Sequence, residues 1–263
     1  MKNRWLLISF SALSSLLFIS ENVAFAEDLS ARQIVDRCLK NNAFGFNNAE
    51  AQIELAIFSK RGSKRIRSIK IKSQEENELT KTLIRFLAPA DVAGTGFLLL
   101  ENRGADDEQY LFLPALGKVK RISGRQRNQR FMGTDLTYAD MESRDLEDAT
   151  LTRLSDQALS GNPTYVIEAV PTNMKESQYS KTKSWIHKTS FVPLKVEFFD
   201  KRGKALKTLL VRRLERKDGR WLSRDTLIKN VQKKTKTEMK VQDIRFDIQF
   251  KKKDFTQRAL KEG

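Results

Sequence analysis

Hydrophobic and polar residues alternate with a period of two along most of this chain. Ile53, Leu55 and Ile57 are each separated by a polar or small residue. Similar alternation, or a short apolar run, returns at residues 79–87, 96–101, 109–114, 118–122, 164–170, 183–187, 193–199, 205–215, 221–232 and 237–250. These segments are typical of β-strands, because successive side chains of a strand point to opposite faces of a sheet. The pattern therefore predicts about ten or eleven strands.

Helical periodicity is limited to a few short segments. Ser30 and Gln33 match a capping box, in which two side chains satisfy backbone N–H groups at the start of a helix. The apolar stripe that follows consists of Ile34, Val35, Cys38 and Leu39. It predicts an amphipathic helix over residues 29–42. Two more short helical segments are expected near residues 138–146 and 255–260.

Short turns connect the predicted strands. Asp218-Gly219 is a strong hairpin signal, and Arg202-Gly203 is a moderate one. Consecutive strands joined by short turns pair antiparallel and mostly in sequence order. A sheet of this size curls or closes to bury one face. The expected fold is mainly β, a strongly curved antiparallel sheet with an apolar concave side and a few helices inside it or over its mouth.

In each predicted strand, the alternate apolar positions point to the concave side of the sheet, and two interpretations of that side remain open. Either large side chains fill it as an ordinary core, or it holds an apolar ligand. In the second case one parity of each strand lines the ligand space. The candidate lining residues are Ile53, Leu55, Ile57, Ile84, Phe86, Leu98, Leu100, Val166, Ile186 and Phe198.

The first 26 residues have the pattern of a secretory signal. Lys2 and Arg4 precede an apolar run that is short for a transmembrane helix, and small residues at Ala24 and Ala26 suit a cleavage site. We expect export to the periplasm, cleavage after Ala26 and a single domain over residues 27–263. An uncleaved N-terminal anchor is the alternative. The single cysteine, Cys38, excludes an internal disulfide and is expected to pack as a small hydrophobic residue.

The chain is strongly basic, with 49 Lys and Arg, 33 Asp and Glu, and a net charge of +16. Removing residues 1–26 takes away two basic residues and one acidic residue, which leaves 47 against 32 and a charge of +15. In an intracellular protein this charge would favour nucleic acid. In an exported protein it favours an anionic lipid surface or an acidic protein partner, and argues against nucleic acid.

Residues with catalytic or metal-binding chemistry are few. His187 is the only histidine, it alternates along a predicted strand beside Trp185, and no nucleophile motif accompanies it. No Cys/His cluster for zinc and no phosphate-binding glycine loop is present. The acids at Asp135 and Asp140 lack the spacing of a calcium loop. We therefore expect no enzyme, no metal and no cofactor.

Basic residues concentrate between residues 118 and 130. Residues 118–122 are predicted to form a strand with one solvent-exposed face. Residues 123–130 are predicted to form a loop, whose arginines have few acidic neighbours before Asp135. Two interpretations remain open, a solvated loop or a docking surface for anionic headgroups or an acidic partner. The candidate docking residues are Arg125, Arg127 and Arg130, with Phe131 and Met132 as apolar contacts.

Residues 86–141 resemble the outer-membrane lipoprotein-sorting protein family, which is similar to the periplasmic lipoprotein carrier LolA. The resemblance is carried by Pro89, Gly94-Thr95-Gly96, the run "YLFLPALGKVKRIS" and the run "FMGTDLTYAD". It implies a half-open antiparallel barrel with helices as a lid and an apolar cavity for acyl chains. It also implies that the protein carries a lipid or lipoprotein towards the outer membrane, with a lipid-exporting inner-membrane transporter as a partner. The alternative is a non-enzymatic accessory subunit of such a transporter.

Overall fold

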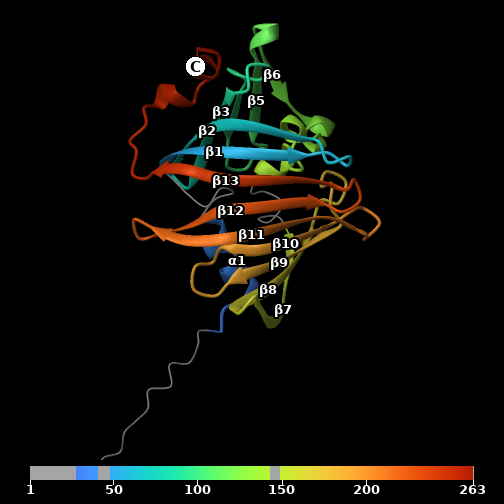
Figure 1. Cartoon of the computed structure of the whole chain (residues 1–263). Helices are drawn as coiled ribbons and strands as arrows, with labels where there is room; N and C mark the ends of the chain where they lie inside the picture. The colour runs from blue at the N-terminus through green and yellow to red at the C-terminus, as the bar shows by residue number, and fades with distance from the viewer. Residues whose placement is uncertain (1–27, 41–47, 143–148, 263) are drawn as a thin grey trace, which may run out of the picture.

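Thirteen strands form one antiparallel sheet, which organises the whole protein (Figure 1). The computed structural model describes residues 28–40, 48–142 and 149–262. The expected signal sequence, residues 1–26, and its cleavage site lie outside the described residues. Within the described ranges, no helix has the length and apolarity needed to cross a membrane.

The strands and helices have the following bounds. The strands are β1 (Ala49–Phe58), β2 (Lys64–Glu76), β3 (Leu79–Ala88), β4 (Gly96–Leu100), β5 (Glu108–Leu113), β6 (Lys118–Ile122), β7 (Ala149–Leu159), β8 (Asn162–Pro171), β9 (Lys181–His187), β10 (Pro193–Phe199), β11 (Ala205–Lys217), β12 (Arg220–Asn230) and β13 (Thr235–Arg245). The α-helices are α1 (Ala31–Leu39) and α3 (Gln257–Glu262). Short 3₁₀ turns are η1 (Pro114–Leu116), η2 (Gly124–Asn128), η3 (Phe131–Gly133), η4 (Ala139–Met141) and η5 (Lys252–Phe255).

The order of the strands divides the sheet into two wings. It runs β6-β5-β4-β3-β2-β1-β13-β12-β11-β10-β9-β8-β7, so β1 and β13 meet in the middle. The chain builds the first wing outward from β1 to β6 and the second wing inward from β7 to β13. The connection between β6 and β7 therefore leads from one edge of the sheet to the other. We call its described part, residues 123–142, the crossover.

The predicted fold class is confirmed, and the number of strands is higher than expected. The two strands without a predicted counterpart are β2 and β7. Charged and polar residues occupy much of both sequences, KRIRSIKIKSQEE and ATLTRLSDQAL. Their apolar positions are too sparse to stand out as alternation, although both strands have full-length partners in the sheet.

The register of pairing defines two faces. Ile53 of β1 lies between Ile69 of β2 and Val241 of β13, and Ile71 pairs with Ile84. All of these side chains belong to one buried cluster with residues of the crossover. We call this the inner face. The opposite, outer face of β3, β4 and β5 is covered by the C-terminal segment, residues 251–262.

The N-terminal helix α1 covers the inner face of the second wing (Figure 1). Its predicted capping box is confirmed, because Ser30 Oγ accepts from the Gln33 N–H and the Gln33 side chain accepts from the Ser30 N–H. Ile34 and Val35 are buried against strands β8 and β9. The predicted hairpin at Asp218-Gly219 also forms, and joins β11 to β12. Both residues have positive φ, 49° and 79°, as a type I′ turn requires.

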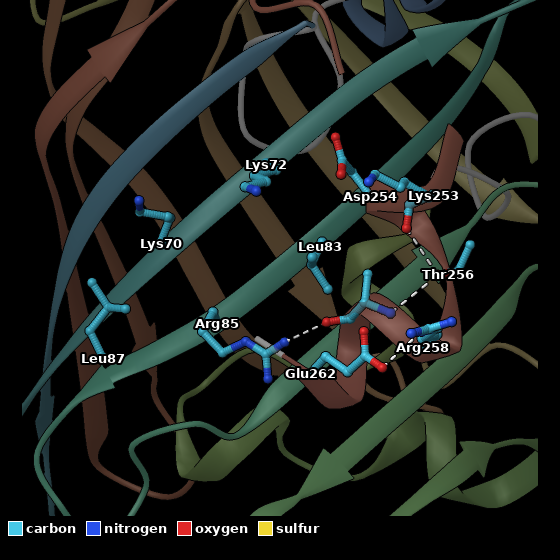
Figure 2. Close-up of a pocket in the computed structure, with 11 residues that line it drawn as sticks. Lys70, Lys72, Leu83, Arg85, Leu87, Lys253, Asp254, Thr256, Arg258 and Glu262 are labelled. Carbon is cyan, nitrogen blue, oxygen red and sulfur yellow. Dashed lines mark hydrogen bonds and ion pairs between the residues drawn. The ribbon is translucent and has the colours of Figure 1, made fainter. Parts of the chain in front are cut away.

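The C-terminal segment is fixed to the outer face by two buried side chains and one arginine. Phe255 and Leu260 pack against Leu83, Leu98 and Phe112. The Arg85 guanidinium donates to the Ala259 carbonyl at 2.9 Å and to the Gly94 carbonyl at 2.8 Å, and Figure 2 shows it pointing towards this segment. Gly96 provides the space for Leu260, because a Cβ atom there would lie 2.6 Å from Leu260 Cδ1.

This contact predicts that Gly96→Ala loosens the C-terminal helix. The added methyl group forces Leu260 out of its place, so we expect a loss of about 1–3 kcal/mol in the free energy of unfolding. Urea unfolding measures the loss, and amide exchange of residues 257–262 should rise. In a Leu260→Ala background the Cδ1 atom is gone, so the added cost of Gly96→Ala should shrink. Equal costs in both backgrounds would contradict the contact.

Candidate functional site

The crossover lies against the inner face of the first wing through an aromatic cluster. Phe131 is 2% exposed, and its ring centre lies 5.2 Å from that of Phe97 and 5.5 Å from that of Tyr138. Phe86 lies 6.0 Å from Phe131, and buried Met141 belongs to the same cluster. Tilted and edge-to-face pairs at these distances are favourable beyond the apolar area they bury. Side chains of the crossover therefore fill this half of the inner face.

A buried ion pair fixes the end of the crossover to the second wing. Lys207 of β11 forms a short contact with Asp140, and the two side chains are 2% and 5% exposed. Asp140 also accepts from the Tyr179 hydroxyl at 2.5 Å and from the Thr137 N–H at 2.6 Å. These additional donors matter because two buried charges need further hydrogen bonds to offset their lost hydration.

A second buried carboxylate fixes the middle of the crossover. The side chain of Asp135 is fully buried and lies 3.1 Å from an Arg130 guanidinium nitrogen. It accepts from the hydroxyls of Thr235 and Thr237, and its own N–H donates to the Thr237 oxygen at 2.9 Å. Asp135 is thus tied to strand β13 on both its backbone and its side chain.

A third polar contact lies where the crossover meets β5. Arg127 pairs with Glu142, and it lies 3.7 Å from Asp106. Burial alone lowers the pKa of Arg127, but the hydrogen bond and charge of Glu142 outweigh it and raise the pKa above its ordinary value. Gln109 of β5 donates to the Tyr138 carbonyl at 3.1 Å and also contacts Glu142. The arginine is therefore held within the protein as a fixed cation.

The inner face of the second wing carries a separate apolar cluster. Leu29, Ile34 and Val35 pack against Tyr165, Ile167 and Ile186. Cys38 lies at the edge of this cluster, where burial raises the pKa of its thiol to about 12. The thiol is neutral at physiological pH and packs as a small apolar group, as predicted.

Seven of the ten predicted lining residues share the inner face. These are Ile53, Leu55, Ile57, Ile84, Phe86, Ile186 and Phe198, as the strand register shows. Contact of these seven with a ligand stays a prediction. For the other three the assigned face is wrong. Leu98 and Leu100 belong to the cluster under the C-terminal segment, and Val166 pairs with Trp185 on the outer parity. Strands β4 and β8 are buried on both faces, so alternation could not identify the inner one.

The predicted docking residues are mostly internal. Arg127 and Arg130 have buried acidic partners, Phe131 belongs to the aromatic cluster, and the Met132 carbonyl accepts from Arg67. As expected, Asp135 is the acid near this loop in the sequence, and Arg130 pairs with it. The partner of Arg127 is Glu142, which lies 15 positions further on and approaches only through the fold. Arg125 alone of the three arginines is exposed. It lines a cavity of about 270 Å³ with Arg127, Glu142 and residues 171–173 and 175–177.

Sequence reasoning missed the polar anchors Lys207, Tyr179 and Thr237. The acids Asp135 and Asp140 were noticed but considered only as a cation site. His187 is half-buried, its Nδ1 lies 2.9 Å from Ser190 Oγ, and burial lowers its pKa. Among the described residues no three His, Cys, Asp or Glu side chains are grouped so as to hold a metal.

Comparison with known proteins identifies the family. A family model described as "Uncharacterized protein" matches residues 78–262. The crystal structure of an outer membrane lipoprotein-sorting protein domain from Vibrio parahaemolyticus is 32% identical, with a TM-score of 0.80 over 87% of this chain and 97% of that one. The chain belongs to the outer-membrane lipoprotein-sorting protein family. Comparison with curated proteins finds no match.

Two further structures support this family and its fold. A DUF1329 family protein from Desulfovibrio piger is 26% identical, with a TM-score of 0.80 over 88% of this chain and 98% of that one. A LolA superfamily protein from Nitrosomonas europaea is 16% identical, with a TM-score of 0.69 over 88% and 99% of the two chains, and shows the fold alone. In this family member, the run "FMGTDLTYAD" that carries the resemblance forms an anchored part of the crossover.

The Lys207–Asp140 pair generates a stability prediction for this family member. Lys207→Met leaves Asp140 buried without its cation, so we expect a loss of about 3–5 kcal/mol in the free energy of unfolding. The double variant Lys207→Met/Asp140→Asn removes both charges and should be more stable than the single variant. Lys81→Met breaks the more exposed pair with Glu76, and should cost about 1 kcal/mol or less. Urea unfolding of the four proteins checks the order, and equal losses in the two single variants would contradict it.

Proposed function

We propose that this lipoprotein-sorting protein is a periplasmic carrier that binds acyl chains on the inner face and takes a lipid or lipoprotein towards the outer membrane. It acts without catalysis, cofactor or metal. Its partners are the acyl chains of the cargo, an anionic membrane surface and a lipid-exporting transporter of the inner membrane. Nucleic acid is not among them.

The observation that carries this proposal is the way in which the apolar inner face is covered. Among the described residues, the hydrogen bonds between the crossover and the sheet involve side chains, as with Asp135 and Thr237 or Arg67 and Met132. Helix α1 contacts the second wing through apolar side chains, through the Arg32 bond to the Ala149 carbonyl and through Arg37 over the Phe191 ring. The segment before the helix is held by Arg153, which donates to Leu29 and Asp28. Both covers can move without breaking the pairing of any strand.

Of the two covers, α1 is the one that an acyl chain can displace more easily. The buried contact of α1 is apolar and its arginine contacts lie at the edge, whereas the crossover is held by three groups of buried polar contacts. An acyl chain that displaces α1 exchanges one apolar contact for another, and each buried methylene contributes about 0.8 kcal/mol. The site that we propose is therefore the surface formed by Tyr165, Ile167 and Ile186.

A second candidate is the accessory subunit of a transporter, with an inner face that is permanently filled. The aromatic cluster of Phe86, Phe97, Phe131 and Tyr138 favours it, because these rings already occupy the first wing. The two candidates differ in one measurable property, which is whether the mature protein holds lipid.

Native mass spectrometry of the mature protein, isolated from the periplasm of its host, tests the carrier directly. We expect adducts with the mass of a lipid or an acylated protein, and their loss after extraction with detergent. The released chains should compete with a fluorescent fatty acid for rebinding. A bare protein mass together with no fatty-acid binding would favour the accessory subunit.

Three isosteric substitutions locate the chain on the fold. Val35→Thr, Val241→Thr and Val166→Thr each place a hydroxyl at a buried position, under α1, beside the crossover and on the outer face. Burying a hydroxyl costs about 1–3 kcal/mol, so all three should be similarly destabilised. Only Val35→Thr should also change fatty-acid binding, and it should strengthen it by about tenfold, because the chain then displaces a helix that is held less tightly. Equal affinities in the three variants would place the chain elsewhere.

The proposed absence of catalysis is tested at His187. Its position beside Ser190 and Trp221 is explained by packing, so His187→Ala should keep lipid load and cargo transfer while losing some stability. Cys38→Ala is the parallel variant on α1. A stably folded His187→Ala protein that loads lipid but no longer transfers it would show that the imidazole has a chemical role.

A further inference from the structure

A second cavity lies on the outer face, on the side of the sheet opposite to the proposed acyl site. It measures about 630 Å³, within the range of ligand pockets. Figure 2 shows Lys70 and Lys72 of β2, and Leu83, Arg85 and Leu87 of β3, along one side of it. The C-terminal segment forms the other side. We call this cavity the outer groove.

The outer groove has an excess of positive charge. Five basic and two acidic side chains line it, which gives a formal charge of +3. Two of the basic groups are occupied, since Arg85 bonds to backbone carbonyls and Arg258 pairs with Glu262 at 2.8 Å. Asp254, the other acid, accepts from the Lys251 N–H at 2.9 Å as a cap of η5.

The lysines of the groove remain available to a ligand. Lys70 lies 3.5 Å from Glu50, which also pairs with Arg245. In the described part of the chain neither Lys72 nor Lys253 forms an ion pair, and Lys72 Nζ lies 6.0 Å from the centre of the Phe250 ring. An ammonium group on a flexible stem binds a phosphate as a point charge, without the planar geometry that a guanidinium needs.

Exposed aliphatic side chains lie beside these lysines. Leu83 is buried in the floor of the groove, whereas Leu87 at its end is 41% exposed. Ile66 shares the outward parity of Lys70 and Lys72 along β2, and is 49% exposed. Lysines with apolar stems around exposed aliphatic residues match the boundary between lipid headgroups and acyl chains.

We propose that the outer groove binds the phosphate of an anionic phospholipid headgroup, so that the protein contacts a membrane with the outer face of β2 and β3. Lys72 and Lys253 hold the phosphate, and Leu87 and Ile66 insert beside it. The basic loop of the crossover offers less for this contact, because Arg127 and Arg130 are paired inside the protein and only Arg125 of its three arginines is exposed. Contact through the outer face leaves the inner face free to take up or release cargo.

Vesicle binding at low ionic strength tests the proposal. The mature protein is mixed with phosphatidylcholine vesicles with and without phosphatidylglycerol, and only the anionic vesicles should bind it. Lys72→Gln/Lys253→Gln should weaken that binding by about thirtyfold. The matched control, Lys204→Gln/Lys229→Gln, removes two exposed lysines from the β10–β11 turn and from β12, and should keep most of it.

The apolar contact has its own matched pair. Leu87→Ser should weaken binding to the anionic vesicles several-fold, whereas Val231→Ser, 39% exposed in the β12–β13 turn, should not. Urea unfolding confirms that all variants are folded. If both double-lysine variants lose the same amount of vesicle binding, the effect is due to net charge alone, and the proposal for the outer groove is wrong. The proposal also fails if the wild type ignores anionic vesicles, or if inorganic phosphate at matched ionic strength displaces it from them completely. Fatty-acid binding should be unchanged throughout, so this test is independent of the carrier.

Discussion

The connection from β6 to β7 is the constraint on which the rest of this structure depends. Because β13 pairs with β1 in the middle of the sheet, β6 and β7 stand at opposite edges, and the crossover lies on the inner face between them. A backbone over an apolar face cannot be hydrated there, so its polar groups need partners from the protein. The anchors at Asp135, Asp140 and Arg127 meet this need at the middle and the end of the crossover.

The buried charges also determine where the crossover lies. Aromatic rings can slide over an apolar surface with little loss, whereas a carboxylate displaced from its cation loses several kcal/mol. Lys207 of β11 and Thr237 of β13 lie on two strands separated by β12, so together they fix one alignment of the crossover against the sheet. The first wing is thereby filled by the crossover, whereas α1 covers the second wing through an apolar cluster. The two halves of the inner face therefore have different covers because the buried ion pairs involve the crossover.

The sequence predicts correctly which residues of a strand point to the inner face wherever the other face of that strand is exposed to solvent. Ile53, Leu55 and Ile57 alternate with polar residues and lie where alternation puts them. Leu98 and Val166 do not, because the outer side of their strands is apolar too: the C-terminal segment covers Leu98, and Val166 is buried next to its pairing partner Trp185. Helix α1 could be predicted from two neighbouring sequence signals, the capping box and the apolar stripe that follows it. The partners of Arg127 and Lys207 could not be predicted, since 15 and 67 residues separate them from Glu142 and Asp140 and only the fold brings them together.

The pairing of β1 with β13 has a consequence for the kinetics of folding. Within each wing every strand pairs with its neighbour in sequence, so both wings can grow from short hairpins. The seam between them joins residues as far apart as Glu50 and Arg245, which are 195 positions apart. Closing so long a loop is slow, because its entropy is lost before the new contacts form. Until the seam closes, the free edges of β1 and β13 can pair with another copy of the chain, so the rate of this single step limits how much protein aggregates during folding.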